Sequence, residues 1–317
     1  MPLPFYKRKE REMSDRPHIS ILIEEMAQVF SSRTFSVFVD GTVGAGGHAK
    51  KILEEHPEIS RFFGFDQDPE ALAIAAKTLE PWKDKVRLVH ANFVDFDEVL
   101  QEEGIAFVDG FFFDLGVSSM QLDNDYKGFS FLKEGPLDMR MNPLNELSAK
   151  EIVNEWSEQE LGQIFRDYGE DPRWKAAARI VVEERRKGPI RTTTQLADLL
   201  SNALKSKIRG KLHPATLVFQ GLRVFVNKEL DVLEKVLGKV IQFLAPKGIV
   251  GVMSFQSLED RIVKNIFRDA ARSVKEGQKK LIPVMELLTK KPIIPSLQEI
   301  RRNSRARSAK LRFAQKN

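Results

Sequence analysis

The chain has 317 residues, no cysteine, five histidines and 42% hydrophobic residues. This length suggests about two domains, or one domain with a large insertion. The lack of cysteine excludes disulfides and thiolate metal sites and is typical of a reducing compartment. No apolar run reaches the roughly 18 residues that a membrane span needs, and segment 1–17 lacks the apolar stretch of a signal peptide. We therefore expect a cytoplasmic protein without membrane contact, with residues 1–17 as a flexible extension of mixed charge.

The net charge of +5 is unevenly distributed along the chain. Residues 271–317 contain 13 Lys and Arg against 3 Glu, a balance of +10, so residues 1–270 carry 37 basic and 42 acidic groups, a balance of −5. Such a basic tail is either a solvated surface or a site for phosphate groups. Part of it could also be an edge strand that supports a sheet, and the pattern alone leaves these alternatives open.

Residues 37–115 alternate between short apolar runs and helix-like segments, which predicts βαβ units and a parallel sheet. Each predicted strand ends at a polar or glycine-containing turn, where open α/β sheets bind ligands. The strands are expected at residues 37–40, 61–66, 86–93 and 108–116. The helices between the first three strands are expected at residues 48–55 and 69–79.

The pattern changes after residue 116. Residues 116–143 fit neither helix nor strand but contain aromatic residues, which favours an ordered functional loop. Residues 147–211 are predicted to be helical, because Ser or Thr precedes Glu or Gln by three positions in three places, as in capping boxes. The exposed face of this segment is expected to be basic, owing to Arg179, Arg185, Arg186, Lys187, Lys205, Lys207, Arg209 and Lys211. One long amphipathic helix that contains Leu222 and Leu237, and then a buried strand over 248–255, follow.

The sheet is therefore predicted to be interrupted by a helical insertion and resumed after it. The expected division is an extension (1–17), the first part of the core (18–125), an inserted helical substrate-binding domain (126–211) and the second part of the core with the basic tail (212–317).

The segment Gly44-Ala45-Gly46-Gly47 lies between a predicted strand and helix. Glycine there lets the backbone turn sharply and approach a ligand, and residues 44–49 match G-x-G-x-x-G/A, although a plain tight turn is the alternative. Asp66 ends the second strand about 20 residues later, where a carboxylate can accept hydrogen bonds from the ribose of S-adenosylmethionine or NAD. Asp68 is the better candidate for a helix cap. Phe93 could flank an adenine or belong to the core.

Asp114 follows three phenylalanines at the end of the fourth strand. A carboxylate after such an apolar run is costly unless it binds something, which favours a functional role. The histidines show no metal-ligand spacing, and no Ser-His-Asp arrangement can be argued, so we predict no catalytic metal.

Together these motifs resemble one family. They read GTVGAGGH, FDQDPEAL, DGFFFDLGVSSMQLD, GFSF, GPLDMRM, YGE, HPAT, FQGLRVFVNKEL, SFQSLEDRIVK and RARSAKLR. In this order, from residue 18 to the C-terminus, they are similar to the bacterial RsmH (MraW) family, and DLGVSS with GPLDMRM is highly specific. The resemblance implies transfer of a methyl group from S-adenosylmethionine to N4 of a cytosine in the decoding region of 16S rRNA. It also implies an α/β fold: a class I (Rossmann-like) methyltransferase core with an inserted helical substrate-recognition domain.

Carried over by motif, the resemblance implies cofactor contacts at Gly46, Gly47, His48, Asp66, Phe93, Asp114 and Gln121. The chain departs from the family pattern at Gln256, where histidine is usual, and at Leu217, where arginine is usual. These departures put substrate contacts at the two positions in doubt.

For catalysis, a hydrogen-bond acceptor on the cytosine amine would raise its electron density in the transition state. Asp114 and Asp138 are the candidate acceptors, and Arg140 could hold a base edge or a phosphate. Two alternatives stay open: an NAD-dependent oxidoreductase, and a non-catalytic RNA-binding or assembly protein with a degenerate methyltransferase core. The expected partner is 16S rRNA within the small ribosomal subunit, although naked RNA is not excluded. The oligomeric state is open, a homodimer included.

Overall fold

The computed structural model describes residues 20–116, 125–204, 213–273, 275–276, 279–280 and 282–317. Its centre is a seven-stranded sheet with the order β3-β2-β1-β4-β5-β9-β8. Five strands are parallel: β1 (Val37–Asp40), β2 (Arg61–Asp66), β3 (Val86–His90), β4 (Val108–Asp114) and β5 (Leu244–Ser254). The antiparallel strand β9 (Lys310–Lys316) pairs with both β5 and β8 (Met285–Leu287). A separate two-stranded ladder joins β6 (Lys275–Glu276) and β7 (Lys279–Lys280).

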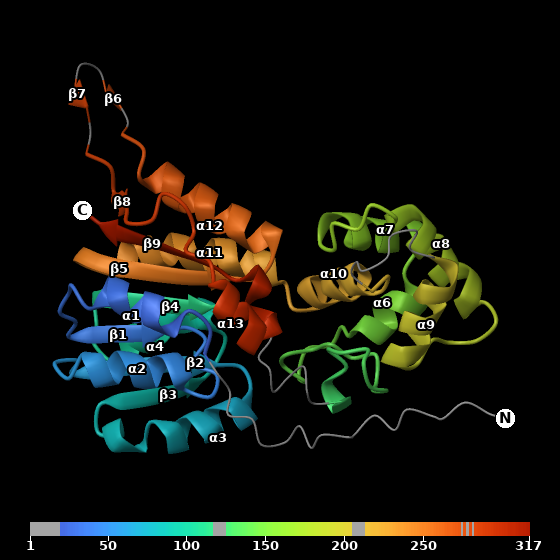
Figure 1. Ribbon diagram of the computed structural model, residues 1–317, viewed down its shortest axis with the longest axis horizontal. Helices are drawn as coiled ribbons and strands as arrows, with labels where there is room; N and C mark the ends of the chain where they lie inside the picture. Colours follow the sequence, from blue (N-terminus) through green and yellow to red (C-terminus); the bar gives the residue numbers. More distant parts are fainter. Residues whose placement is uncertain (1–19, 117–124, 205–212, 274, 277–278, 281) are drawn as a thin grey trace.

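Helices cover both faces of this sheet, which confirms the predicted α/β fold (Figure 1). One face packs against α1 (Ile23–Phe30), α2 (Gly47–Glu55) and α3 (Pro69–Thr78). The other packs against α4 (Phe96–Glu102), α11 (Glu229–Phe243) and α12 (Ser257–Ala270). Because successive side chains of a strand point to opposite faces, Phe112 enters the first layer while Phe111 and Phe113 enter the second. This double burial explains the uninterrupted apolar run in β4.

The helical insertion lies between β4 and β5 and has its own hydrophobic core. It contains α6 (Ala149–Glu155), α7 (Glu158–Asp167), α8 (Trp174–Arg185), α9 (Thr193–Ala203) and α10 (Thr216–Val226). Ser148 and Ser157 form the expected capping boxes, and the Thr192 side chain accepts a hydrogen bond from the Gln195 N–H. Val218 and Leu222 of α10 belong to this core, so the insertion continues beyond the expected boundary at residue 211. Figure 1 shows α10 reaching from the sheet into the insertion.

The single long helix expected around Leu222 and Leu237 is wrong, because the chain forms two helices, α10 and α11. They are separated at Asn227 and Lys228, and Lys228 has a left-handed φ of 51°. The Asn227 side chain accepts a hydrogen bond from the Met141 N–H and donates one to the Met139 carbonyl, both at 2.8 Å. The break therefore lets α10 join the core of the insertion and α11 the core beside the sheet.

The basic tail is largely built into the fold. It contains α13 (Leu297–Arg302), the 3-10 turn η4 (Ser304–Ser308) and β9, which lies inside the sheet between β5 and β8. Ala306 and Ala309 are buried, and Arg312 is only 8% exposed. The tail is therefore not a wholly solvated surface. Its strand β9 lies inside the sheet, and the edge position belongs to the short strand β8, which is also part of residues 271–317.

The remaining short 3-10 turns are η1 (Glu80–Trp82), η2 (Phe93–Asp95) and η3 (Asp125–Lys127). Within the described part of the chain, no helix has the length and apolar character required to cross a membrane.

Candidate active site

A cavity of about 790 Å³ opens at the carboxyl ends of the parallel strands. One wall comes from the turns after β1, β2, β3 and β4. The facing wall comes from residues 129–132 and 141 of the insertion and from α10, and the N-terminus of α12 and residues 303–308 of the tail complete it. The family resemblance implied cofactor contacts at seven residues. Five of them line this cavity, namely Gly47, His48, Asp66, Phe93 and Asp114, and Gly46 lies in the turn beside it. Gln121 lies outside the described residues.

The glycine turn after β1 requires glycine at particular positions. Gly44 and Gly46 have left-handed φ values of 52° and 85°, which side chains disfavour. A Cβ at Gly47 would collide with the Ser20 hydroxyl. The turn thus places backbone directly against the cavity at the start of α2, as ligand-binding βα turns do.

Asp66 ties the glycine turn to the end of β2. Its Oδ2 accepts a hydrogen bond from the Gly44 N–H at 3.0 Å, and its Oδ1 accepts one from the Asp68 N–H at 2.9 Å. Each carboxylate oxygen can accept a further hydrogen bond, so the group is still able to bind two hydroxyls. Burial raises the pKa of Asp66 despite these two donors. Asp68 caps α3 by accepting a hydrogen bond from the Glu70 N–H, as expected.

Asp114 at the end of β4 faces His48 at the start of α2. His48 Nδ1 lies 3.5 Å from Asp114 Oδ2, while His48 Nε2 lies 3.0 Å from the Ile21 carbonyl. A carbonyl oxygen only accepts, so Nε2 carries a hydrogen, and Nδ1 is the ring nitrogen that faces Asp114. Burial, reinforced by the charges of Asp40 and Glu259, raises the pKa of Asp114 well above its usual range. Asp114 and His48 are therefore neighbouring groups between which one proton can pass.

Asp40, at the end of β1, is a buried carboxyl group next to the cavity-lining residues Gly41 and Thr42, and the sequence reasoning missed it. It is 1% exposed, its Oδ1 accepts a hydrogen bond from the Thr42 N–H at 3.0 Å, and its Oδ2 has no partner among the described residues. Burial raises the pKa of Asp40 to about 7, against the effect of the Thr42 N–H and together with the Asp66 charge. The signal was available, because Asp40 ends an apolar strand just before a glycine turn, as Asp66 and Asp114 end theirs.

A cluster of buried polar side chains joins α10 of the insertion to α11 and α12 of the core. Arg223 of α10 holds Glu229 of α11 through Nε and Nη2, both at 2.9 Å. Glu259 of α12 accepts hydrogen bonds from the Phe255 N–H at 2.9 Å and the Gln256 N–H at 3.1 Å. Burial and Glu229, opposed by Arg223, raise the pKa of Glu259 to about 7. All five residues line the cavity, so Gln256, which stands where the family usually has histidine, faces the site.

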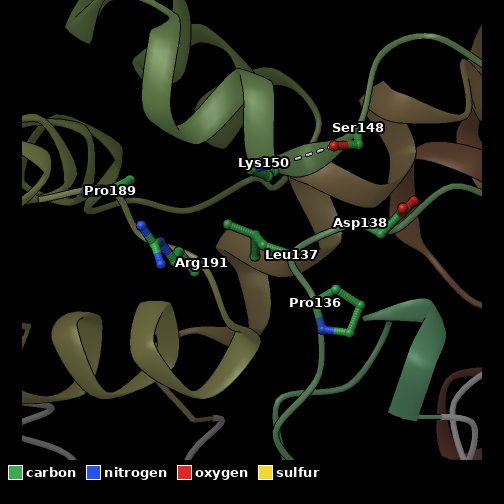
Figure 2. A pocket seen from close by; sticks show the side chains of 7 residues that line it. All are labelled: Pro136, Leu137, Asp138, Ser148, Lys150, Pro189 and Arg191. Carbon is green, nitrogen blue, oxygen red and sulfur yellow. Dashed lines mark hydrogen bonds between the residues drawn. The ribbon is translucent and has the colours of Figure 1, made fainter.

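Asp138 and Arg140 lie elsewhere. Both oxygens of Asp138 accept hydrogen bonds from Arg140, through Nε and Nη2 at 2.8 Å each, and Arg140 Nη1 donates to the Asn145 carbonyl at 2.5 Å. Neither residue lines the large cavity, and Asp138 lies at a second cavity within the insertion (Figure 2). This pair fixes the conformation of its own loop. Leu217 on α10 is also absent from the cavity lining.

Two arginines of the tail, Arg305 and Arg307, line the large cavity. The charge of the tail left phosphate binding as one of several alternatives, and nothing in the sequence placed the tail at the same cavity as the glycine turn. The two segments lie at one cavity because β9, which follows the arginines, is inside the sheet beside β5.

We expect Asp40→Asn to stabilise the unliganded protein more at pH 8 than at pH 5. The pKa of Asp40 is raised on folding, so its contribution to stability is full at low pH and is lost as the pH rises through about 7. Asparagine keeps an acceptor for Thr42 and removes the buried charge, which is worth a few kcal/mol at most, at about 1.4 kcal/mol per pKa unit. Thermal unfolding of both proteins at the two pH values measures the difference. Glu259 is present in both proteins, so its own titration cancels in the comparison. An equal gain in Tm at the two pH values would contradict the raised pKa of Asp40.

The cavity has the properties that S-adenosylmethionine requires. Its volume lies within the roughly 300–1,000 Å³ of small-molecule sites. Asp66 and Asp114, which line it, have raised pKa values, and a positively charged ligand favours the ionised form of such carboxyl groups. In the part of the chain that the structure describes, no group of three or more His, Asp or Glu could hold a metal ion.

A sheet in this order, with a glycine turn after β1 and carboxylates ending β1, β2 and β4, defines the class of S-adenosylmethionine-dependent methyltransferases. The chain belongs to the MraW methylase family, whose family model matches residues 15–317. It is 51% identical to the ribosomal RNA small subunit methyltransferase H of Protochlamydia amoebophila, over 100% of this chain and 99% of that protein. It is 45% identical to the same enzyme of Geotalea uraniireducens, over 96% of this chain and 100% of that protein.

Among solved structures, an rRNA methylase from Streptococcus thermophilus covers 95% of this chain and 99% of its own, with 9% identity and a TM-score of 0.44. Membership of a methylase family excludes the NAD-dependent oxidoreductase that the glycine pattern alone left open.

Proposed function

We propose that this protein transfers the methyl group of S-adenosylmethionine to N4 of a cytosine in the decoding region of small-subunit rRNA. The observation that carries the proposal is the position of Asp114. This carboxylate ends β4 in a cavity that has the glycine turn and Asp66 on one side and the insertion and tail arginines on the other. Relatives along the whole chain are small-subunit rRNA methyltransferases, which supports the choice of RNA. We take the assembled small subunit as the physiological substrate.

The bound cofactor supplies an electrophilic methyl group, so the protein's main task is to align donor and acceptor. In this proposal the glycine turn and Asp66 hold the cofactor, with the Asp66 oxygens accepting hydrogen bonds from the ribose hydroxyls. Phe93 packs edge-to-face on Phe113, with 5.5 Å between ring centroids, and offers its other surface to the adenine.

Asp114 is the proposed acceptor for the target amine. In its ionised form it accepts a hydrogen bond from N4–H and raises the electron density on the nitrogen as the new bond forms. The methylated amine must lose a proton, and Asp114 is placed to take it. His48 Nδ1, 3.5 Å from Asp114 Oδ2, is the next acceptor on the path.

The target base must leave its stack to reach this depth. Aromatic rings of the insertion, Phe129 and Phe131, form the wall where an extruded base would lie. Phe131 is held in place by stacking on His213, with 4.6 Å between ring centroids. Arg307 at the same cavity is suited to a phosphate of the target nucleotide.

The test is to incubate the purified protein with S-adenosylmethionine and small-subunit RNA, free or assembled, and to analyse the RNA by mass spectrometry. The proposal expects N4-methylcytosine at a single position. The alternative of a non-catalytic RNA-binding protein, motivated by Gln256 and Leu217, expects RNA binding without methylation. Loss of the modified base in a strain without the gene, and its return with the gene, would extend the result to the cell.

We expect Asp66→Ala to weaken cofactor affinity roughly ten- to a hundredfold while the fold stays intact. The change removes a charge-assisted acceptor for the ribose, worth about 1.5–3 kcal/mol. Calorimetric titration with S-adenosylhomocysteine measures the loss. Asp68→Ala is the matched control, because it removes the neighbouring carboxylate that caps α3. Unchanged affinity in Asp66→Ala would remove this residue from the site.

A further inference from the structure

The insertion contains a second cavity of about 530 Å³ that shares no lining residue with the first. Its walls come from residues 136–138, from the start of α6 and from the segment before α9. Figure 2 shows Leu137 and Pro136 between Arg191 on one side and Asp138 on the other, with Lys150 and Pro189 completing the rim.

Hydrogen bonds fix the walls of this cavity. The Leu137 N–H donates to the Arg191 carbonyl at 3.2 Å, beside an isolated bridge between Pro136 and Thr192. The Asn154 side chain on α6 makes two hydrogen bonds with the backbone of Ile190. It accepts one from the Ile190 N–H at 2.8 Å and donates one to the Ile190 carbonyl at 2.9 Å. These hydrogen bonds within the protein hold the walls of the cavity in place, as in preformed binding sites.

The charge of this cavity is positive. Lys150 and Arg191 are exposed, and neither terminal group makes a hydrogen bond or salt bridge with the described residues. Asp138 is paired with Arg140 through two hydrogen bonds. Glu151 accepts a hydrogen bond from Ser148 and interacts electrostatically with Lys150, but it does not line the cavity. Several other cations in the described part of the insertion are paired with carboxylates, as Arg179 is with Glu183. Leu137 is buried, so the accessible apolar surface comes from the exposed prolines Pro136 and Pro189. Two cations beside these prolines suit a nucleotide, with its phosphate on the cations and its sugar or base on the prolines.

One short segment connects the two cavities. Asp138 lines the second cavity and Met141 lines the first, and three residues span at most roughly 11 Å. Asn227 holds this segment at the Met139 carbonyl and the Met141 N–H. An RNA strand whose base enters the first cavity would therefore pass the second within a few nucleotides.

We propose that the second cavity binds a nucleotide of the substrate RNA that flanks the target, with its phosphate between Lys150 and Arg191. The proposal rests on the proposed rRNA function and adds a site to it. Holding the flanking nucleotide fixes the strand while the target base is extruded, so the cavity contributes to substrate affinity and leaves cofactor binding unaffected.

The test compares the double variant Lys150→Ser/Arg191→Ser with wild type in binding to a small-subunit RNA fragment that contains the target. The matched control is Lys175→Ser/Arg186→Ser, which removes two exposed cations without carboxylate partners among the described residues, from α8 and its C-cap in the same insertion and outside both cavities. We expect about tenfold weaker RNA binding for the double variant. Its plot of log K against log salt should be flatter by about 0.7 for each phosphate that the protein no longer neutralises. The control should change both quantities much less, and affinity for S-adenosylhomocysteine should be equal in all three proteins.

Wild-type RNA affinity and salt slope in the Lys150→Ser/Arg191→Ser protein would overturn the proposal, whether or not wild type methylates the RNA. An equal loss in the α8 control would also overturn it, because the effect would then be general electrostatics. Failure of the wild-type protein to form N4-methylcytosine would instead overturn the proposed function, whatever the variants bind.

Discussion

Replacing Asp114 by asparagine should lower kcat at saturating cofactor by at least about tenfold. Asparagine has nearly the same size but presents no charge to the target amine and cannot take its proton. The acid limb of the pH profile should change as well. Asp114 acts in its ionised form, and burial raises its pKa, so the wild-type rate should fall on the acid side at a higher pH than an ordinary carboxylate would give. This limb should be absent from Asp114→Asn.

The matched control is Asp109→Asn, at the opposite end of the same strand. Asp109 Oδ2 accepts hydrogen bonds from the Ser36 and Val37 N–H groups at 2.8 and 2.9 Å, a role that asparagine keeps, and the residue is outside the cavity. Single-turnover kinetics at several pH values separate methyl transfer from product release. Wild-type turnover in Asp114→Asn would assign this carboxylate a structural role and leave the reaction without its proposed acceptor.

The parts of the fold that the sequence predicted are those with local signals. Strands β1, β2 and β4 are short apolar runs that end at Gly or Asp, and the capping boxes at Ser148 and Ser157 involve residues only three positions apart. The third strand is shorter than expected, since β3 ends at His90 and residues 93–95 form a 3-10 turn. Asp66 was found by its place about 20 residues after the glycine turn, and Asp114 because a carboxylate after three phenylalanines is costly unless it binds something.

The features that the sequence did not predict depend on contacts between distant residues. The helix break at Asn227 is stabilised by the loop around Met139 and Met141, 88 and 86 positions away along the chain. Periodicity cannot show that the two halves of an apolar stripe belong to different cores. The pairing of Asp138 with Arg140 is local, but two residues of opposite charge in an irregular loop do not reveal whether they face each other or a substrate.

The tail is the clearest example of a feature that the sequence left open. Its charge suggested phosphate binding, and its position in the sheet adds a structural role. Arg312 of β9 is 8% exposed, and its Nε donates to Asp260 Oδ1 at 2.7 Å. Lys310 also reaches Asp260, at 3.2 Å from Oδ2. Part of the positive charge after residue 271 therefore neutralises a buried carboxylate of α12, and only the remainder is available to RNA.

Asp260→Ala should accordingly lower the free energy of unfolding by about 3–5 kcal/mol, because it leaves the Arg312 guanidinium buried without its partner. Burial would raise the pKa of Asp260, but Arg312 and Lys310 together lower it. A lowered pKa stabilises the fold above the unfolded value and loses this effect as the pH falls through the folded value. The gap between wild type and Asp260→Ala should therefore be full at pH 7 and shrink below about pH 4. Chemical denaturation at a series of pH values measures it.

Two variants test this assignment. Asp269→Ala, at the other end of α12, removes an exposed partner of Arg268 and should cost less than about 1 kcal/mol. Replacing both members of the buried pair, as Asp260→Leu/Arg312→Met, should recover most of the loss, since apolar groups of similar volume need no counter-charge. If the double variant is also as unstable as Asp260→Ala, the pair does more than neutralise charge, and packing at β9 must account for the difference. If Asp260→Ala keeps wild-type stability but weakens RNA binding, β9 is not the structural strand that its place between β5 and β8 indicates.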